Sequence, residues 1–312
     1  MVEIKDISFK NSTPQNCRVL PVMRFLLVSF SGGETSAYMA KMLIDNYSDK
    51  FNLFFVYANT GKEREETLEF INKCDKHFNM NLVWVEAETN SEYGKGVSAK
   101  IVNFETASRN GEPFRKMIAK HGIPNVENGF CTRELKDYAI RAYCRSIGLK
   151  NNDYQIAIGI RADEIDRVNP NRKKLNLVYP LVEFKRTTKP EINKFWSEMP
   201  FRLNLKSYEG NCDFCFKKSD RKLLTIAKEN PTILEWWQNI EIEFGNYNPR
   251  NANPPFTFFR KKRNANWFLE NSVNFRDLAL DEKLNNNFQT SFFTELDFSG
   301  SCEESCLAFN NA

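Results

Sequence analysis

The sequence predicts an α/β protein: a parallel sheet with helices on both faces, followed by a mostly helical, cysteine-bearing module. Two observations support this prediction. Short apolar runs alternate with segments of helical periodicity up to about residue 200, and a close cysteine pair and further helical patterns follow. Strand–helix alternation implies parallel strands joined by right-handed crossovers. We therefore expect an N-terminal appendage over residues 1–23, an α/β domain over 24–200 and the cysteine-bearing module over 201–312.

The expected strands are short apolar runs that end at turn signals. They cover residues 25–30, 51–58, 82–86 and 154–160, with a further extended segment at 178–184. The expected helices cover residues 35–47, 63–78, 132–147, 189–198, 219–229 and 231–244. Residues 87–128 have no clear periodicity, which indicates a lid or an insertion.

The composition is that of a globular protein: 41% of the 312 residues are hydrophobic and 27% are charged. The net charge of +4 permits an anionic substrate but does not require nucleic acid. No segment approaches the roughly 18 apolar residues of a membrane helix, and the N-terminus has no apolar leader. We therefore expect a cytoplasmic protein without stable disulfides and without a membrane partner.

The residues 31–36, SGGETS, follow the first apolar run and precede a helical segment. Glycines let the backbone approach an anion closely, and a helix N-terminus offers free N–H groups with partial positive charge. The alternative is a tight strand-to-helix turn with good capping residues. The position after the first strand favours a phosphate site, because ligands bind at the carboxyl ends of parallel strands.

The stretch VSFSGGETSAYMAKM resembles the PP-loop of the adenine-nucleotide alpha-hydrolase superfamily. The stretches ANTGKEREETLEFI, CTRELK, GIRADEIDR and YPLVEF resemble motifs of its phosphoadenosine-phosphosulfate-reductase-like branch, and they occur in that branch's order over residues 24–230. The resemblance implies an enzyme that binds ATP or phosphoadenylyl sulfate, with magnesium as a further candidate ion. Thr35 stands where the family often has Asp, so a carboxylate that would position such an ion is missing.

The resemblance also implies the residues of the nucleotide site. Phosphate or sulfate would be held by Ser29, Ser31, Gly32, Gly33, Thr35 and Ser36. Thr60 would face the adenosine, and Gly159 and Arg161 would face the nucleotide, with Arg161 as a fixed catalytic charge. The alternative for Arg161 is a salt-bridged loop with Glu164 and Arg167.

Two close cysteine pairs, Cys212 with Cys215 and Cys302 with Cys306, are typical of a metal or iron–sulfur site. By resemblance to the iron–sulfur members of the reductase branch, Cys131 would join the first pair in a [4Fe–4S] cluster, with Cys302 or Cys306 as the fourth ligand. Alternatively, the four C-terminal cysteines hold zinc or a cluster, and Cys131 is a catalytic thiol that carries a persulfide near the nucleotide.

The run 256–268 interleaves basic and aromatic residues, as a nucleic-acid-binding surface does. The alternative is a helix with a solvated basic face and buried aromatic side chains. The charge and aromatic pattern leave both open.

Three functions follow from these observations. The first is an ATP-dependent sulfurtransferase that acts on a nucleic acid or a small molecule and takes sulfur from a donor. The second is a sulfonucleotide reductase that releases sulfite with a thioredoxin-like reductant. Such reductases carry a C-terminal Glu-Cys-Gly-x-His motif, whereas residues 301–306 read SCEESC and lack histidine. The third is a non-catalytic nucleotide- or nucleic-acid-binding module. The sequence predicts no oligomeric state.

Overall fold

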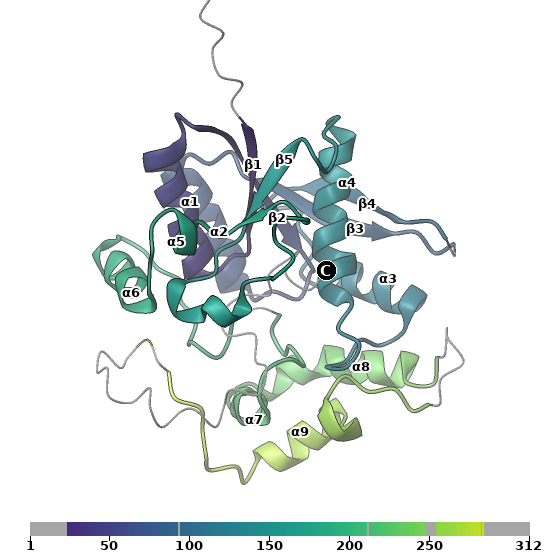
Figure 1. Cartoon of the computed structure of the whole chain (residues 1–312). Coiled ribbons are helices and arrows are strands. Elements are labelled where there is room, and N and C mark those ends of the chain that lie inside the picture. The colour runs from purple at the N-terminus through teal and green to yellow at the C-terminus, as the bar shows by residue number, and fades with distance from the viewer. Residues whose placement is uncertain (1–23, 93, 211, 248–253, 282, 284–312) are drawn as a thin grey trace, which may run out of the picture.

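A six-stranded sheet with the order β4-β3-β2-β1-β5-β6 forms the centre of the protein (Figure 1). The computed structural model describes residues 24–92, 94–210, 212–247, 254–281 and 283. All neighbouring strands pair in parallel except β3 and β4. The strands are β1 (Arg24–Phe30), β2 (Phe51–Asn59), β3 (Val83–Thr89), β4 (Val97–Val102), β5 (Tyr154–Ala157) and β6 (Leu177–Val178).

Helices cover both faces of this sheet, as the sequence predicts. The main helices are α1 (Glu34–Tyr47), α2 (Glu65–Phe78), α3 (Glu112–His121), α4 (Tyr138–Ser146), α5 (Pro180–Glu183), α6 (Lys189–Glu198), α7 (Asp220–Glu229), α8 (Leu234–Phe244) and α9 (Ala265–Ser272). Short π or 3-10 turns are η1 (Arg133–Asp137), η2 (Ala162–Arg167), η3 (Pro231–Ile233) and η4 (Arg260–Lys262).

Side chains along each strand point alternately to the two faces of the sheet, so a hydrophobic core forms on each face. In β1, Leu26 and Val28 pack into the core that α1, α2, α5 and α6 cover, whereas Leu27 packs into the opposite core with α3 and α4. The central strands are buried on both faces, which explains why they read as continuous apolar runs.

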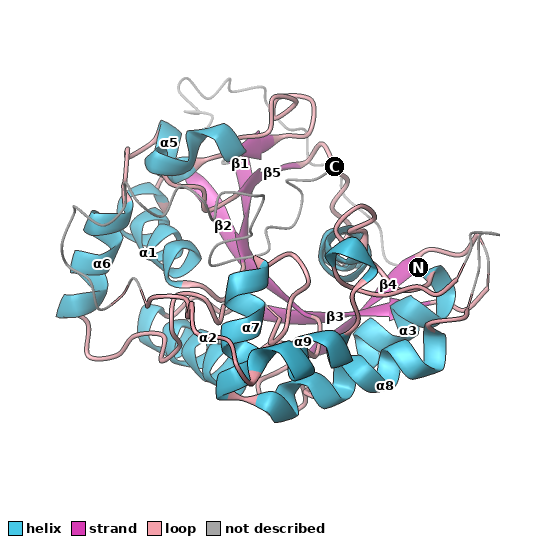
Figure 2. Cartoon of the chain, turned by 90° about the horizontal axis from the view of Figure 1, so that it is seen from below, coloured by secondary structure: helices cyan, strands magenta, loops and turns pink. Residues whose placement is uncertain are grey.

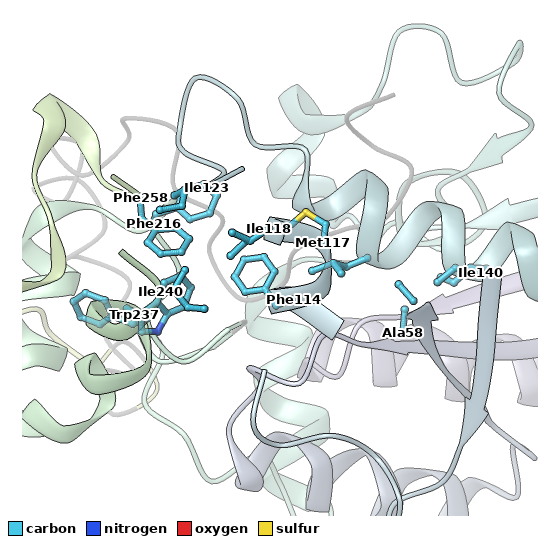
Figure 3. Close-up of a cluster of buried hydrophobic side chains, with 14 of the residues drawn as sticks. Ala58, Phe114, Met117, Ile118, Ile123, Ile140, Phe216, Trp237, Ile240 and Phe258 are labelled. Atoms are coloured by element: carbon cyan, nitrogen blue, oxygen red, sulfur yellow. The ribbon is translucent and has the colours of Figure 1, made fainter. Parts of the chain in front are cut away.

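The helices α7, α8 and α9 lie below the sheet, on the side where the parallel strands end (Figures 1 and 2). Aromatic side chains of α8 and of the segment before α9 continue the core of α3: the Phe114 ring centroid lies 5.8 Å from that of Trp237, which lies 4.7 Å from that of Phe258 (Figure 3). This packing holds the segment after residue 200 against the carboxyl edge of the sheet. The domain boundary at residue 200 stays a prediction.

Several local expectations were wrong. The irregular stretch 87–128 contains the antiparallel edge strand β4 and the helix α3. The segment 178–184 is extended only at its start, because Pro180 takes the first position of the short helix α5. In the run 256–268, Phe258 and Phe259 are buried and only Arg260–Lys262 and Ala265–Ser272 form helical turns.

The buried Phe258 and Phe259 agree with the structural alternative for this run, but its single helix with a solvated basic face is not what the structure shows. Arg260 donates to the carbonyl oxygens of Lys217 and Lys218, and Arg263 pairs with Asp220. Within the described ranges, no helix is long and apolar enough to cross a membrane. The predicted appendage and the pair Cys302 and Cys306 lie outside the described residues.

Candidate nucleotide and cysteine site

The phosphate loop, residues 31–36, lies between β1 and α1, at the carboxyl end of the sheet's central strand. The Ser36 hydroxyl donates to the carbonyl oxygen of Gly33 at 2.9 Å and accepts from the backbone N–H of Ser31 at 3.3 Å. These bonds close the loop on itself. Ser29, at the end of β1, is buried beneath it. The loop therefore sets its backbone N–H groups at the N-terminus of α1, where an anion is stabilised.

Two glycines allow this loop to pack tightly. Gly32 has a φ of +85°, and a Cβ there would lie 2.9 Å from side-chain carbons of both Thr67 and Ile71 in α2. Gly159, after β5, allows close contact from the other side, since its Cβ would lie 3.3 Å from the Cα of Ser36. Two of the three predicted glycines, Gly32 and Gly159, thus have steric reasons to be glycine.

Buried polar atoms without partners surround the loop. Among the described residues, Ser31 Oγ, Thr67 Oγ1 and Arg64 Nε are buried and make no hydrogen bond. Thr67 packs directly against Gly32. Buried polar groups are nearly always paired, so orphaned donors indicate a missing ligand or water. Ser31 in the loop and Thr67 beside it are therefore placed to contact an anionic ligand.

Arg161 is buried and reaches the loop. Its Nη1 lies 3.5 Å from Thr35 Oγ1, and its Nε lies 3.2 Å from both carboxylate oxygens of Asp163. It also pairs with Glu164 at 3.5 Å, as the alternative of a salt-bridged loop anticipated. Arg161 is thus ion-paired, as in the alternative, and its guanidinium lies beside the Thr35 hydroxyl of the loop. Its contact with a nucleotide stays a prediction.

The end of β2 brings a cysteine to this edge of the sheet. Thr60 Oγ1 lies 3.6 Å from Cys212 Sγ and donates to the Glu63 carboxylate at 2.8 Å. Because the threonine proton goes to Glu63, the cysteine S–H is the donor in the contact with Thr60. Glu63 and Cys212 also form an isolated β-bridge, which fixes the cysteine segment to the strand end.

Three predicted cysteines converge on one small cavity. Its lining consists of Thr60, Phe114, Cys131, Thr132, Leu135, Lys136, Cys212, Cys215, Phe216, Lys217 and Trp237. Cys131 is half-buried and precedes the π turn Arg133–Asp137, which carries the buried Lys136 to the same cavity. Such π turns often occur at functional sites. Lys136 pairs with Glu63 at 3.5 Å.

Burial raises the pKa of the Cys212 thiol, and the neighbouring Glu63 carboxylate raises this pKa further. The thiol is therefore protonated at neutral pH unless a cation binds beside it. Burial also lowers the pKa of Lys218, whose ammonium donates to the carbonyl oxygen of Cys212 at 2.9 Å. In the part of the chain that the structure describes, no three Cys, His, Asp or Glu side chains lie close enough to hold a metal ion.

Ion pairs that sequence reasoning missed attach the cysteine segment to the nucleotide edge. Lys62 pairs with Asp213 at 2.7 Å, and its ammonium lies 4.8 Å from the ring centroid of Trp236. Arg64 pairs with Glu209 at 3.1 Å. The charged run KER at 62–64 directly after a buried strand was the one available signal. The partners, Asp213 and Glu209, lie far along the chain, and their local sequence carries no signal of these ion pairs.

The comparisons with known proteins agree with this geometry. A family model of the phosphoadenosine phosphosulfate reductase domain matches residues 26–186, about half of the chain. The chain belongs to this family. The predicted resemblance is thereby confirmed, and the family implies binding of an adenine nucleotide.

The chain is also similar to a protein of Escherichia phage lambda with the name "Uncharacterized nin region protein ORF290". The two are 29% identical over 290 residues, which cover 91% of this chain and 94% of the phage protein. This similarity extends past residue 186, so it includes sequence that contributes to the cysteine cavity.

Proposed function

We propose that the protein binds ATP and uses it in sulfur chemistry, as an iron–sulfur-containing sulfurtransferase acting on a nucleic acid or a small molecule. The observation that carries this proposal is the 3.6 Å contact between Thr60 Oγ1 and Cys212 Sγ. It brings a thiol to the carboxyl end of β2, beside the strand whose end forms the phosphate loop. Nucleotide and sulfur could therefore meet at one edge of the sheet.

In this proposal the phosphate loop and Arg161 hold the phosphates of the nucleotide. An oxygen atom of the acceptor attacks the α-phosphorus of ATP, and pyrophosphate leaves. A hydrosulfide ion then attacks the activated carbon, and AMP leaves with the former acceptor oxygen. Arg161 stabilises charge on the phosphates. In the alternative route, the terminal sulfur of a Cys131 persulfide, loaded by the sulfur donor, attacks the activated carbon in place of hydrosulfide, and AMP leaves. A second thiol of the cavity then attacks Cys131 Sγ, which releases the thiolated acceptor and leaves a disulfide for an external thiol reductant to reduce.

The cysteine cavity is the proposed position of the [4Fe–4S] cluster, with zinc as the alternative. Cys131, Cys212 and Cys215 all line this cavity. Among the described residues, no three Cys, His, Asp or Glu side chains lie close enough to hold a metal ion. A cluster therefore requires these thiols to move closer together and a ligand from outside the described residues, Cys302 or Cys306, to complete the site. If the cluster uses all three, the delivery of persulfide by Cys131 is excluded.

The family match favours a second candidate, a sulfonucleotide reductase. A cysteine thiolate would attack the sulfur of adenylyl sulfate or its 3′-phosphorylated form and release the adenylate. A second thiol would then attack the Sγ atom of the first cysteine, so that sulfite leaves and a disulfide remains for a thioredoxin-like protein to reduce. The adjacent thiols of the cavity are compatible with this sequence of steps.

One assay distinguishes the candidates. Protein purified without oxygen is supplied with adenylyl sulfate or phosphoadenylyl sulfate and reduced thioredoxin, and separately with ATP, sulfide and candidate nucleic-acid acceptors. We expect no sulfite from the first reaction, and AMP and pyrophosphate from the second. Sulfite that requires thioredoxin would contradict the transferase and establish the reductase. Nucleotide binding without either reaction would favour the non-catalytic module.

A further inference from the structure

A buried carboxylate lies at the start of the helix that carries the phosphate loop. Glu34 is 4% exposed, and it directly follows Gly33. An acid in the first turn of a helix interacts favourably with the partial positive charge there, which is about half an elementary charge. An anionic ligand of the loop would depend on this same charge. Without compensation, the carboxylate of Glu34 would therefore oppose the binding of phosphate.

Arg202 compensates this carboxylate through a bidentate contact. Its Nε and Nη2 each donate to one oxygen of Glu34, both at 3.1 Å. The backbone N–H of Leu203 donates to Glu34 Oε1 at 3.3 Å, and Lys283 Nζ lies 3.6 Å from the same oxygen. Paired charge-assisted bonds of this kind fix both geometry and charge. The carboxylate is thus held by two cations and one amide.

The compensating residues come from outside the segment that the family model matches, residues 26–186. Leu203 is buried in the core that α1 and α2 share, and the indole of Trp196 donates to the carbonyl oxygen of Glu34 at 3.0 Å. These contacts hold Arg202 against the loop even without a nucleotide. A residue remote in sequence is therefore built into the electrostatics of the phosphate loop.

We propose that Arg202, supported by Lys283, cancels the charge of Glu34 and thereby sets the affinity of the phosphate loop for anionic nucleotides. This inference rests on the proposed binding of ATP. Arg202 is a positioning residue, because it acts on the ligand through Glu34. The effect is specific to the charge of the ligand, so it must distinguish ATP from adenosine.

The test compares Arg202→Gln, Glu34→Gln and the double variant by calorimetric titration with ATP and with adenosine. Arg202→Gln should weaken ATP binding on the order of tenfold, since unit charges a few ångströms apart interact strongly at an effective dielectric constant of about 20. The double variant should restore ATP affinity, and Glu34→Gln alone should strengthen it. Adenosine affinity should change little in all three.

A matched control is Arg115→Gln, which breaks the pair of Arg115 with Glu243 between α3 and α8, away from the loop. It should leave both affinities unchanged. Should Arg202→Gln fail to fold, Glu34→Gln alone decides, because weaker ATP binding in that variant contradicts the inference.

The inference is also overturned if the double variant binds ATP no better than Arg202→Gln, or if ATP and adenosine affinities fall equally. Those results would leave the proposed function intact. Absence of ATP binding in the unmodified protein would instead overturn the proposed function, and this inference with it.

Discussion

Replacement of Gly32 by alanine separates the backbone requirement of the phosphate loop from its steric requirement. The left-handed conformation destabilises the fold by about 1–2 kcal/mol when the residue is not glycine. Alanine also lowers the conformational entropy of the unfolded chain, which stabilises the fold by about 0.4–1 kcal/mol. A Cβ at 2.9 Å from Thr67 and Ile71 adds an overpacking cost of about 1–3 kcal/mol. Gly32→Ala should therefore lower the free energy of unfolding by about 1–4.5 kcal/mol.

Gly148 is the matched control, since its φ is +86° and a Cβ at this residue would have no other atom within 4 Å. Gly148→Ala should lower the free energy of unfolding by only about 0–1.5 kcal/mol, because the overpacking cost is absent. Urea unfolding gives both values, and calorimetric titration with ATP gives the affinities. Gly32→Ala should also bind ATP more weakly, because the loop has to shift, whereas Gly148→Ala should bind normally. Equal destabilisation of the two variants with equal ATP binding would refute the steric account of the loop.

Two further predictions concern the C-terminal segment. Burial raises the pKa of Glu241 to about 7, while its carboxylate accepts from the backbone N–H groups of Phe258 and Ala265. The folded protein therefore retains a proton that the unfolded chain releases above about pH 4.5, so stability should fall as the pH rises from about 4.5 to 7. Urea unfolding at pH 5 and pH 8 should show a smaller decrease in Glu241→Gln, and an unchanged decrease would argue against the raised pKa. Cys212→Ser combined with Cys215→Ser should remove bound iron or zinc, as measured by elemental analysis of anaerobic protein, and full metal content would place the metal elsewhere.

The sheet and the phosphate loop were predictable because local sequence determines them. The strands β1 and β2 are buried on both faces and read as apolar runs, and the glycine pair after β1 marks the turn. The edge strand β4 was missed, because a half-solvated strand has a mixed pattern, VSAKIV, without an apolar run. The prediction of an extended segment at 178–184 was wrong, because Pro180 favours the first position of a helix.

The meeting of Cys131 with Cys212 and Cys215 could be anticipated only through the family resemblance. The spacing of these cysteines along the chain does not show that they meet at the end of β2. Tertiary packing of the segment after residue 200 against the sheet brings Cys212 and Cys215 to the start of the π turn. The bond of Glu34 to Arg202 was equally inaccessible, since nothing in either local sequence indicates its partner. Predicted metal ligation involving Cys302 and Cys306 lies outside the described residues.

The proposed chemistry requires that the phosphate loop and the cysteine cavity form a single site. Alkylation of metal-free protein, followed by mass spectrometry, measures the rate of modification of the half-buried Cys131 with and without saturating ATP. We predict that ATP slows this modification in the unmodified protein and has a weaker effect in Gly32→Ala. An unchanged rate at Cys131 while ATP is demonstrably bound would contradict the single site and separate the nucleotide from the thiols.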